Sequence, residues 1–269
     1  MLPRWGLGST PRWSVVGGVC LTALCLVTCC LALTRPVSSP AFTAPPAALD
    51  QPTGPADRPA ALFVGDSYTG GLGTTGPHQG YACLAAELMN WTCNVDAQPG
   101  TGYLNDGATN STTLRPFVQR LEEDARRYRV DVVVIDGGRN DTPAGIDRTS
   151  TAATEYLVAI RRLWPRAAVV VIAPFFLTVA PVDFPFGVQF GQRLPDIAQP
   201  FAGVVVDPMA SGWVPPPDAA TMLSPDGVHP NPAGHRYLAE HLSRALREAG
   251  LADVPITDDG LDATSRWGG

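Results

Sequence analysis

The feature that most restricts the fold of this chain is a regular alternation, from Ala60 onward, of short apolar runs with longer segments of helical periodicity. Such alternation is typical of βαβ units, in which helices connect parallel strands. The predicted strands are residues 60–64, 93–97, 130–136, 167–173 and 203–206. The predicted helices are residues 80–89, 114–128, 150–164, 187–198 and 232–249. This α/β pattern predicts a three-layer α/β/α sandwich around a five-stranded parallel sheet.

Residues 114–128 show the helical pattern clearly. The apolar side chains expected on the inner face are Leu114, Phe117, Val118, Leu121 and Ala125. The charged side chains expected on the outer face are Glu122, Glu123, Arg126 and Arg127. We therefore expect this segment to cover one face of the sheet.

Residues 1–35 have the composition of a targeting segment. Arg4 and Arg12 precede an apolar run, residues 13–33, and Arg35 follows it, so we expect the N-terminus to stay inside the cell. The run is long enough to anchor the chain in a membrane, but residues 30–32 could instead end a cleaved signal peptide. The alternative is a cytoplasmic protein in which this segment is a core helix. We expect an extracytoplasmic domain, secreted or held at the membrane by this segment.

Three further stretches complete the predicted organisation. Residues 36–59 are rich in Pro and Ala, a composition that favours an extended chain and predicts a linker. Residues 60–250 form the predicted globular domain, and residues 251–269 a C-terminal tail.

The charge of the chain argues against one class of partner. The formal net charge is −6, and the chain contains no lysine. Arg4, Arg12 and Arg35 are the only charged side chains before Asp50, so the predicted domain is more acidic still. Nucleic acid is therefore not expected as a partner, because phosphate binding needs a positive surface.

The cysteines divide between the targeting segment and the domain. Four of the six precede residue 36, which leaves Cys83 and Cys93 as the only pair in the domain. In an exported domain these two could form a disulfide across a short loop, and the alternative is two buried free thiols. Two sulfurs and no nearby histidine beyond His78 do not make a metal site, and we expect no metal and no cofactor.

Ser67 is the first candidate for chemistry. It follows an apolar run, residues 60–64, and Gly65 allows the chain to turn sharply there. The position is the carboxyl edge of the predicted sheet, where ligands bind in open α/β folds. A Gly-Asp-Ser sequence can also be only a favourable turn. Ser67 therefore needs partners before it counts as a nucleophile.

Three other segments supply such partners. His229 could take the proton of Ser67, and Asp226, three residues earlier, could orient the imidazole. The backbone N–H groups of Ser67 and Gly102 and the side-chain amide of Asn140 could together stabilise an oxyanion. The sequence thus predicts a catalytic triad and a three-donor oxyanion hole at one edge of the sheet.

In this arrangement the chain resembles the SGNH, or GDSL-type, hydrolase family. Four blocks match in order: residues 65–67, a glycine aligned best with Gly102, residues 138–141 and residues 226–230. The resemblance covers about residues 60–249 and implies a flavodoxin-like sandwich and a serine esterase or acyl-transfer mechanism without metal. Two departures are Tyr68, where the older family signature has Leu, and Gly100, which competes with Gly102 for the second block.

Substrate contacts are less clearly encoded. Trp213, in the Pro-rich loop before His229, is expected to line the substrate cleft or simply to pack in the fold. Arg139 is expected to reach the mouth of the pocket or to form a surface salt bridge. The expected partner is a small ester, a lipid or an acylated glycan, with membrane contact through the N-terminal segment. The competing functions are ester hydrolysis, acyl transfer or deacetylation on envelope glycan or lipid, and surface binding with a silent triad.

Overall fold

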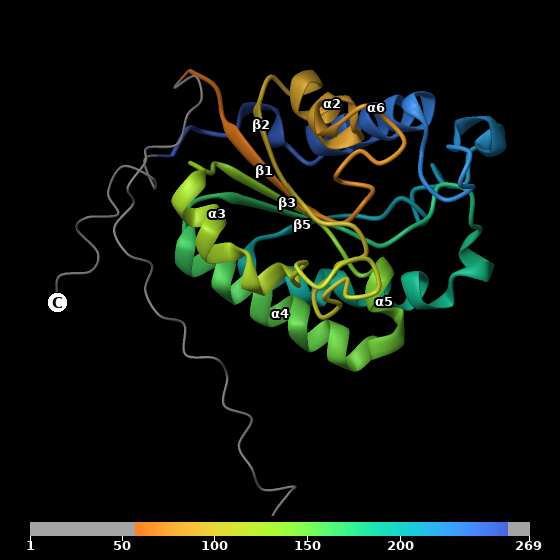
Figure 1. The fold of residues 1–269 in the computed structure, drawn as a ribbon. Coiled ribbons are helices and arrows are strands. Elements are labelled where there is room, and N and C mark those ends of the chain that lie inside the picture. Colours follow the sequence, from red (N-terminus) through yellow and green to blue (C-terminus); the bar gives the residue numbers. More distant parts are fainter. Residues whose placement is uncertain (1–56, 258–269) are drawn as a thin grey trace, which may run out of the picture. The chain divides into compact units, whose positions relative to one another are not determined.

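The computed structural model describes residues 57–257, which form one α/β unit (Figure 1). The predicted targeting segment and nearly all of the predicted linker lie outside the described residues. Within residues 57–257, no helix combines the length and apolar character needed to cross a bilayer.

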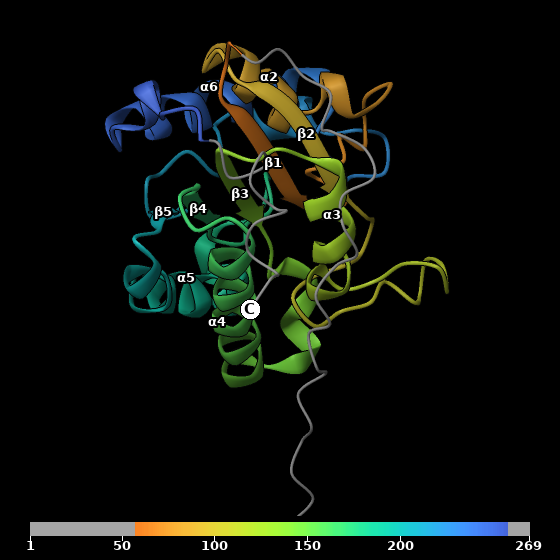
Figure 2. The ribbon, with the colours of Figure 1, turned by 90° about the vertical axis from the view of Figure 1, so that its left-hand side faces the viewer.

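The sheet has five parallel strands in the order β2-β1-β3-β4-β5. Figure 2 shows them side by side in this order. The strands are β1 (Ala60–Gly65), β2 (Thr92–Ala97), β3 (Val132–Asp136), β4 (Ala168–Ile172) and β5 (Val204–Val206). Gly65 pairs with both Ala97 and Asp136, so the last residues of β1, β2 and β3 lie side by side. The loops that follow these three strands therefore start from a common edge.

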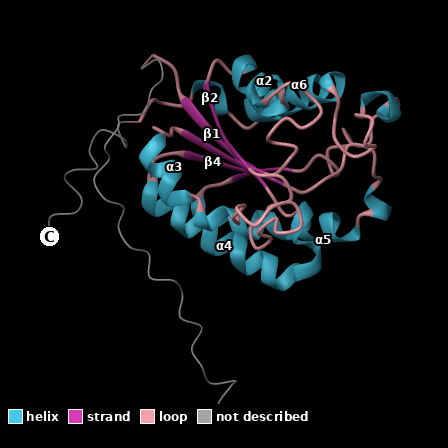
Figure 3. Cartoon of the chain, in the orientation of Figure 1, coloured by secondary structure: helices cyan, strands magenta, loops and turns pink. Residues whose placement is uncertain are grey.

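Helices cover both faces of the sheet, which confirms the predicted three-layer sandwich (Figures 1 and 3). The α-helices are α2 (Tyr81–Leu88), α3 (Leu121–Arg127), α4 (Ile146–Leu163), α5 (Pro185–Ala198) and α6 (Pro232–Glu248). Helices α2 and α6 lie on one face, and α3, α4 and α5 lie on the other. The 3₁₀ turns are Pro77–Gln79, Phe117–Gln119, Arg139–Ala144, Pro181–Asp183, Gln199–Phe201, Ala219–Met222 and Leu251–Asp253.

The predicted helix 114–128 is wrong at its beginning and on one face. Helix α3 begins only at Leu121, after a 3₁₀ turn, and Val118 is 40% exposed. Arg120 and Asp124 are buried instead, and Arg120 forms an ion pair of 3.1 Å with Asp96 of β2. A contact with a distant strand thus overrides the local pattern.

The predicted boundary at residue 250 is too early. Thr257 is buried, and its hydroxyl donates to Asp131 at 2.9 Å, beside the start of β3. The other oxygen of Asp131 accepts from the Ala60 N–H at 2.7 Å, so one carboxylate joins both ends of the described chain. Residues 251–257 therefore belong to the domain.

The predicted disulfide is confirmed, since the sulfurs of Cys83 and Cys93 are 2.03 Å apart. The bridge joins α2 to the start of β2 across a sequence separation of 10.

Reducing this bridge should lower the free energy of unfolding by about 3 kcal/mol, because the unfolded chain regains the entropy of the open loop. Urea unfolding with and without reductant measures the difference. The double variant Cys83→Ser/Cys93→Ser is the control, and its midpoint should not respond to reductant. Equal midpoints for the oxidised and reduced natural chain would contradict the expectation.

Candidate active site

Ser67 lies in the tight turn that follows β1. A side chain at Gly65 would clash with the hydroxyl of Thr69, so only glycine fits at the end of the strand. The Leu72 N–H donates to the Ser67 carbonyl at 3.0 Å and closes the turn. The residue is largely buried, with 9% of its surface exposed.

His229 reaches Ser67 from the loop before α6. Its Nε2 lies 2.8 Å from the Ser67 Oγ, and its Nδ1 lies 2.7 Å from Asp226 Oδ2. Because the carboxylate can only accept, we assign the proton to Nδ1, which leaves Nε2 to accept from the serine hydroxyl. The side chains of Ser67, His229 and Asp226 therefore form a continuous hydrogen-bonded chain suited to activating a hydroxyl.

Asp226 is held as a carboxylate by its own loop. Its Oδ1 accepts the backbone N–H groups of Val228 at 2.9 Å and His229 at 3.0 Å. The backbone bond from His229, followed by the bond to the His229 ring, lowers the pKa of Asp226 to about 2. One oxygen thus shapes the loop while the other orients the imidazole.

Tyr68 joins the loop that carries His229 to the turn after β1 by a hydrogen bond, a role that was not predicted from the sequence. Its hydroxyl donates to the Val228 carbonyl at 2.7 Å and accepts from the Leu177 N–H at 3.3 Å. Burial raises the pKa of Tyr68 to about 12, so the donor keeps its proton. The only signal in the sequence was the departure from leucine at this position.

Asn140 reaches the same edge of the sheet. Its Nδ2 donates to Asp66 Oδ2 at 2.8 Å and to the Thr101 carbonyl at 3.0 Å. Both N–H groups of the amide are thus engaged, and an oxyanion would have to replace one of these acceptors.

The prediction that Gly102 offers a free N–H is wrong. That N–H donates to the Asn105 carbonyl at 2.9 Å, because Asp141 binds the N–H groups of residues 103–105 and folds the loop back on itself. Within residues 57–257, neither Ser67 nor Gly100 uses its backbone N–H in a hydrogen bond. Of the two glycines, Gly100 is therefore the one whose N–H remains available as a donor.

A family comparison bears directly on this arrangement. The model of the GDSL-like lipase/acylhydrolase family matches residues 63–237, which include all four blocks. The chain belongs to this family. A GDSL lipase of Mycobacterium tuberculosis is 30% identical over 195 residues, covering 69% of this chain and 80% of that protein. This GDSL-like chain is therefore an ester hydrolase.

Solved structures share the fold of this GDSL-like hydrolase. A putative arylesterase from Agrobacterium tumefaciens has a TM-score of 0.53 and 18% identity, covering 71% of this chain and 99% of that one. A carbohydrate esterase family 2 enzyme from Corynascus thermopiles has a TM-score of 0.55 and 20% identity, covering 74% of this chain and 69% of that one. At these identities the likeness extends to the fold alone.

The structure places Arg139 of the GDSL-like hydrolase away from any substrate. The prediction that it reaches the pocket mouth or forms a surface salt bridge is wrong, because its side chain is only 2% exposed. Two carboxylates, Asp66 and Asp136, hold it beneath the turn of Ser67 at 2.7 and 2.9 Å.

Trp213 of the GDSL-like hydrolase is a packing residue. It is 6% exposed, and its ring stacks on His241 of α6 with 5.3 Å between ring centres. Its carbonyl accepts the hydroxyl of Tyr237 at 2.7 Å, which fixes the Pro-rich loop against α6. Of the two roles predicted for Trp213, the structure therefore supports packing.

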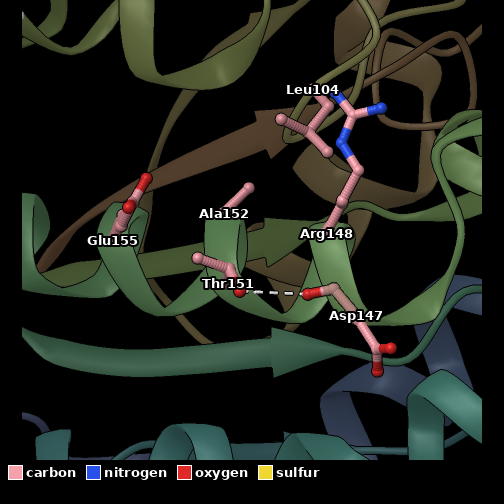
Figure 4. Close-up of a pocket in the computed structure, with 6 residues that line it drawn as sticks. All are labelled: Leu104, Asp147, Arg148, Thr151, Ala152 and Glu155. Atoms are coloured by element: carbon pink, nitrogen blue, oxygen red, sulfur yellow. Dashed lines mark hydrogen bonds between the residues drawn. The ribbon is translucent and has the colours of Figure 1, made fainter. Parts of the chain in front are cut away.

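An open hollow of about 310 Å³ lies beside α4 of the GDSL-like hydrolase (Figure 4). Its lining residues are Leu104, Asp147, Arg148, Thr151, Ala152 and Glu155. Ser67, Asp226 and His229 are not among these lining residues, so the hollow is distinct from the candidate active site.

Metal ligands do not gather anywhere in the described part of the chain. No cluster of three or more His, Cys, Asp or Glu side chains within residues 57–257 could hold a metal ion.

Proposed function

We propose that this GDSL-like ester hydrolase is a serine esterase that cleaves carboxylic esters through an acyl-enzyme on Ser67. The observation that carries the proposal is the unbroken chain from Ser67 Oγ through His229 to Asp226, with contacts of 2.8 and 2.7 Å. A nucleophile, a base and an orienting acid within hydrogen-bond distance are the parts that acyl transfer to a hydroxyl needs.

The reaction follows from the direction of these bonds. His229 Nε2 takes the proton of Ser67 as the hydroxyl oxygen attacks the ester carbon. Backbone N–H groups of Ser67 and Gly100 and the Asn140 amide stabilise the oxyanion. The protonated His229 then gives its proton to the leaving alcohol. Water activated by the same imidazole releases the acid and restores Ser67.

Covalent labelling tests this proposal directly. The purified full-length chain, in detergent if the N-terminal segment requires it, should react with a fluorophosphonate probe and hydrolyse short p-nitrophenyl esters. Peptide mass spectrometry should place the label on Ser67. A folded chain that neither labels nor hydrolyses any ester in a chain-length panel would refute the serine mechanism and favour a silent binding domain.

Acyl transfer to a sugar or lipid acceptor would use the same acyl-enzyme. Product analysis with added glycan or lipid acceptors separates the two outcomes, because hydrolysis releases free acid at a rate that does not depend on the acceptor. We propose hydrolysis as the primary activity, since the family match is to acylhydrolases.

Asn140→Ala should lower kcat by roughly 100- to 1000-fold, the usual effect of losing one oxyanion donor. KM should change little, because the donor binds charge that develops only in the transition state. Fluorophosphonate labelling of Ser67 should persist at a reduced rate. Full activity in Asn140→Ala would exclude its side chain from the oxyanion hole.

We also propose that the domain works outside the cytoplasm. The bridge between Cys83 and Cys93 supports export, because disulfides persist in oxidising compartments. Arg4, Arg12 and the apolar run that follows support an N-terminal targeting segment. Cell fractionation and the intact mass of the exported chain test this proposal, and a reduced chain found only in the cytoplasm would contradict it.

A further inference from the structure

A buried ion network lies beneath the turn that carries Ser67. The side chains of Arg139, Asp66 and Asp136 are 2%, 0% and 1% exposed. One guanidinium nitrogen of Arg139 lies 2.7 and 2.8 Å from the two oxygens of Asp66, and the other lies 2.9 Å from Asp136 Oδ1. Asp66 follows β1 and Asp136 ends β3, so the arginine joins the carboxyl ends of two neighbouring strands.

The remaining contacts of Arg139 fix its position further. Its Nε donates to the Phe175 carbonyl after β4 at 3.0 Å, and the guanidinium lies 4.3 Å from the ring centre of Tyr68. Burial lowers the pKa of Arg139, but Asp136 and Asp66 reverse this effect and leave it raised. The side chain is therefore a permanent, buried cation that forms no hydrogen bond with Ser67 or His229.

The network reaches the oxyanion site through Asp66. The same Asp66 Oδ2 that binds Arg139 accepts the Asn140 amide at 2.8 Å. The second N–H of that amide binds a neutral acceptor, the Thr101 carbonyl, at 3.0 Å. Hydrogen bonds to a charged acceptor are stronger than those to a neutral one. The bond to Asp66 can therefore persist while the bond to Thr101 is exchanged for an oxyanion.

We propose that Arg139 is a positioning residue that, through Asp66, aims the Asn140 amide at the oxyanion. This inference rests on the proposed serine mechanism and assigns its donor a support that makes no contact with substrate. Arg139 holds the Asp66 carboxylate in one place, and Asp66 holds one N–H of Asn140. The other N–H can then exchange the Thr101 carbonyl for the oxyanion while Asp66 keeps the amide anchored.

A double-mutant cycle separates positioning from a general effect on stability. Arg139→Lys keeps the charge but loses the forked geometry, and it should lower kcat roughly 10- to 100-fold with KM nearly unchanged. In the Asn140→Ala background the same change should lower kcat by no more than about twofold, because its effect passes through the missing amide. The matched control is Arg129→Lys, in a partly buried ion pair with Asp131 near the start of β3. Its effect should be the same with and without Asn140.

Side-chain NMR of Asn140 supplies a readout that does not need turnover. The two amide signals, identified by their loss in Asn140→Ala, should move toward free-amide values in Arg139→Lys and stay unchanged in Arg129→Lys. If Arg139→Lys does not fold, Asp66→Asn replaces it, since it keeps the shape and removes the charge that holds Arg139.

The positioning role would be overturned if the amide signals of Asn140 did not shift in Arg139→Lys. It would also be overturned if Arg139→Lys lowered kcat by the same factor in the natural chain and in Asn140→Ala. If the natural chain neither hydrolyses esters nor labels at Ser67, the proposed function is refuted. The amide signals would still decide whether Arg139 orients Asn140.

Discussion

Ser67→Ala should abolish ester hydrolysis, with kcat lowered by about 10⁴- to 10⁶-fold to the residual level that binding and the oxyanion hole alone provide. The reason is geometric, because no other hydroxyl is hydrogen-bonded to His229 Nε2 in the described chain. Covalent labelling by a fluorophosphonate should disappear completely. Steady-state assays at high enzyme concentration and intact mass after labelling measure the two effects.

Ser211→Ala is the matched control, since Ser211 is an exposed serine in the loop that follows β5. This variant should label and hydrolyse like the natural chain. The substitution at Ser67 should leave the unfolding midpoint nearly unchanged, so lost activity cannot be attributed to lost structure. Substantial turnover in Ser67→Ala would mean that the nucleophile lies elsewhere.

Asp226→Asn should lower kcat by about 10⁴-fold, although it changes only one oxygen to an NH₂ group. The variant can still accept the backbone N–H groups of Val228 and His229 through Oδ1 and keep the loop shape. Its NH₂ group would face His229 Nδ1 and donate to it. The imidazole proton would then sit on Nε2, where it blocks acceptance of the Ser67 proton.

The charge of Asp226 should not vary across the pH range of the assay. The pKa of Asp226 in the natural chain is lowered to about 2, so its carboxylate is charged at every pH where the fold is assayed. Rates of the natural chain between about pH 5 and pH 9 should therefore show no step that arises from Asp226, which titrates well below this region. Asp218→Asn, an exposed carboxylate of the preceding loop, is the control and should be fully active. Loss of less than tenfold in Asp226→Asn would exclude its orienting role.

The strands of this fold could be predicted because their signal is local. Residues 60–64 are apolar throughout and prove to be buried throughout, as expected of a parallel strand covered on both faces. The side chains of the triad could be chosen because Asp226 and His229 are three residues apart and Ser67 follows a strand. Their meeting in space is shown by the structure, while their catalytic roles stay predictions.

The features that could not be predicted depend on contacts between residues that lie far apart in the sequence. Arg139 follows a strand like any loop arginine, and only the fold brings Asp66 to it across 73 positions of sequence. The choice between Gly100 and Gly102 as the second backbone donor to the oxyanion depends on which N–H is already hydrogen-bonded. The Gly102 N–H is bonded because Asp141 accepts the N–H groups of residues 103–105 and folds the loop. The start of α3 likewise depends on the pair between Arg120 and Asp96.

The loop that carries both His229 and Asp226 has a consequence for how activity arises during synthesis. The proposed acid and base are neighbours in the sequence, but the proposed nucleophile, Ser67, lies 162 positions earlier in the chain. The chain up to the end of β5 thus contains all five strands and Ser67, but neither Asp226 nor His229. Under the proposed mechanism, reactivity toward esters is therefore expected only once the final quarter of the chain, which carries this loop and α6, is in place.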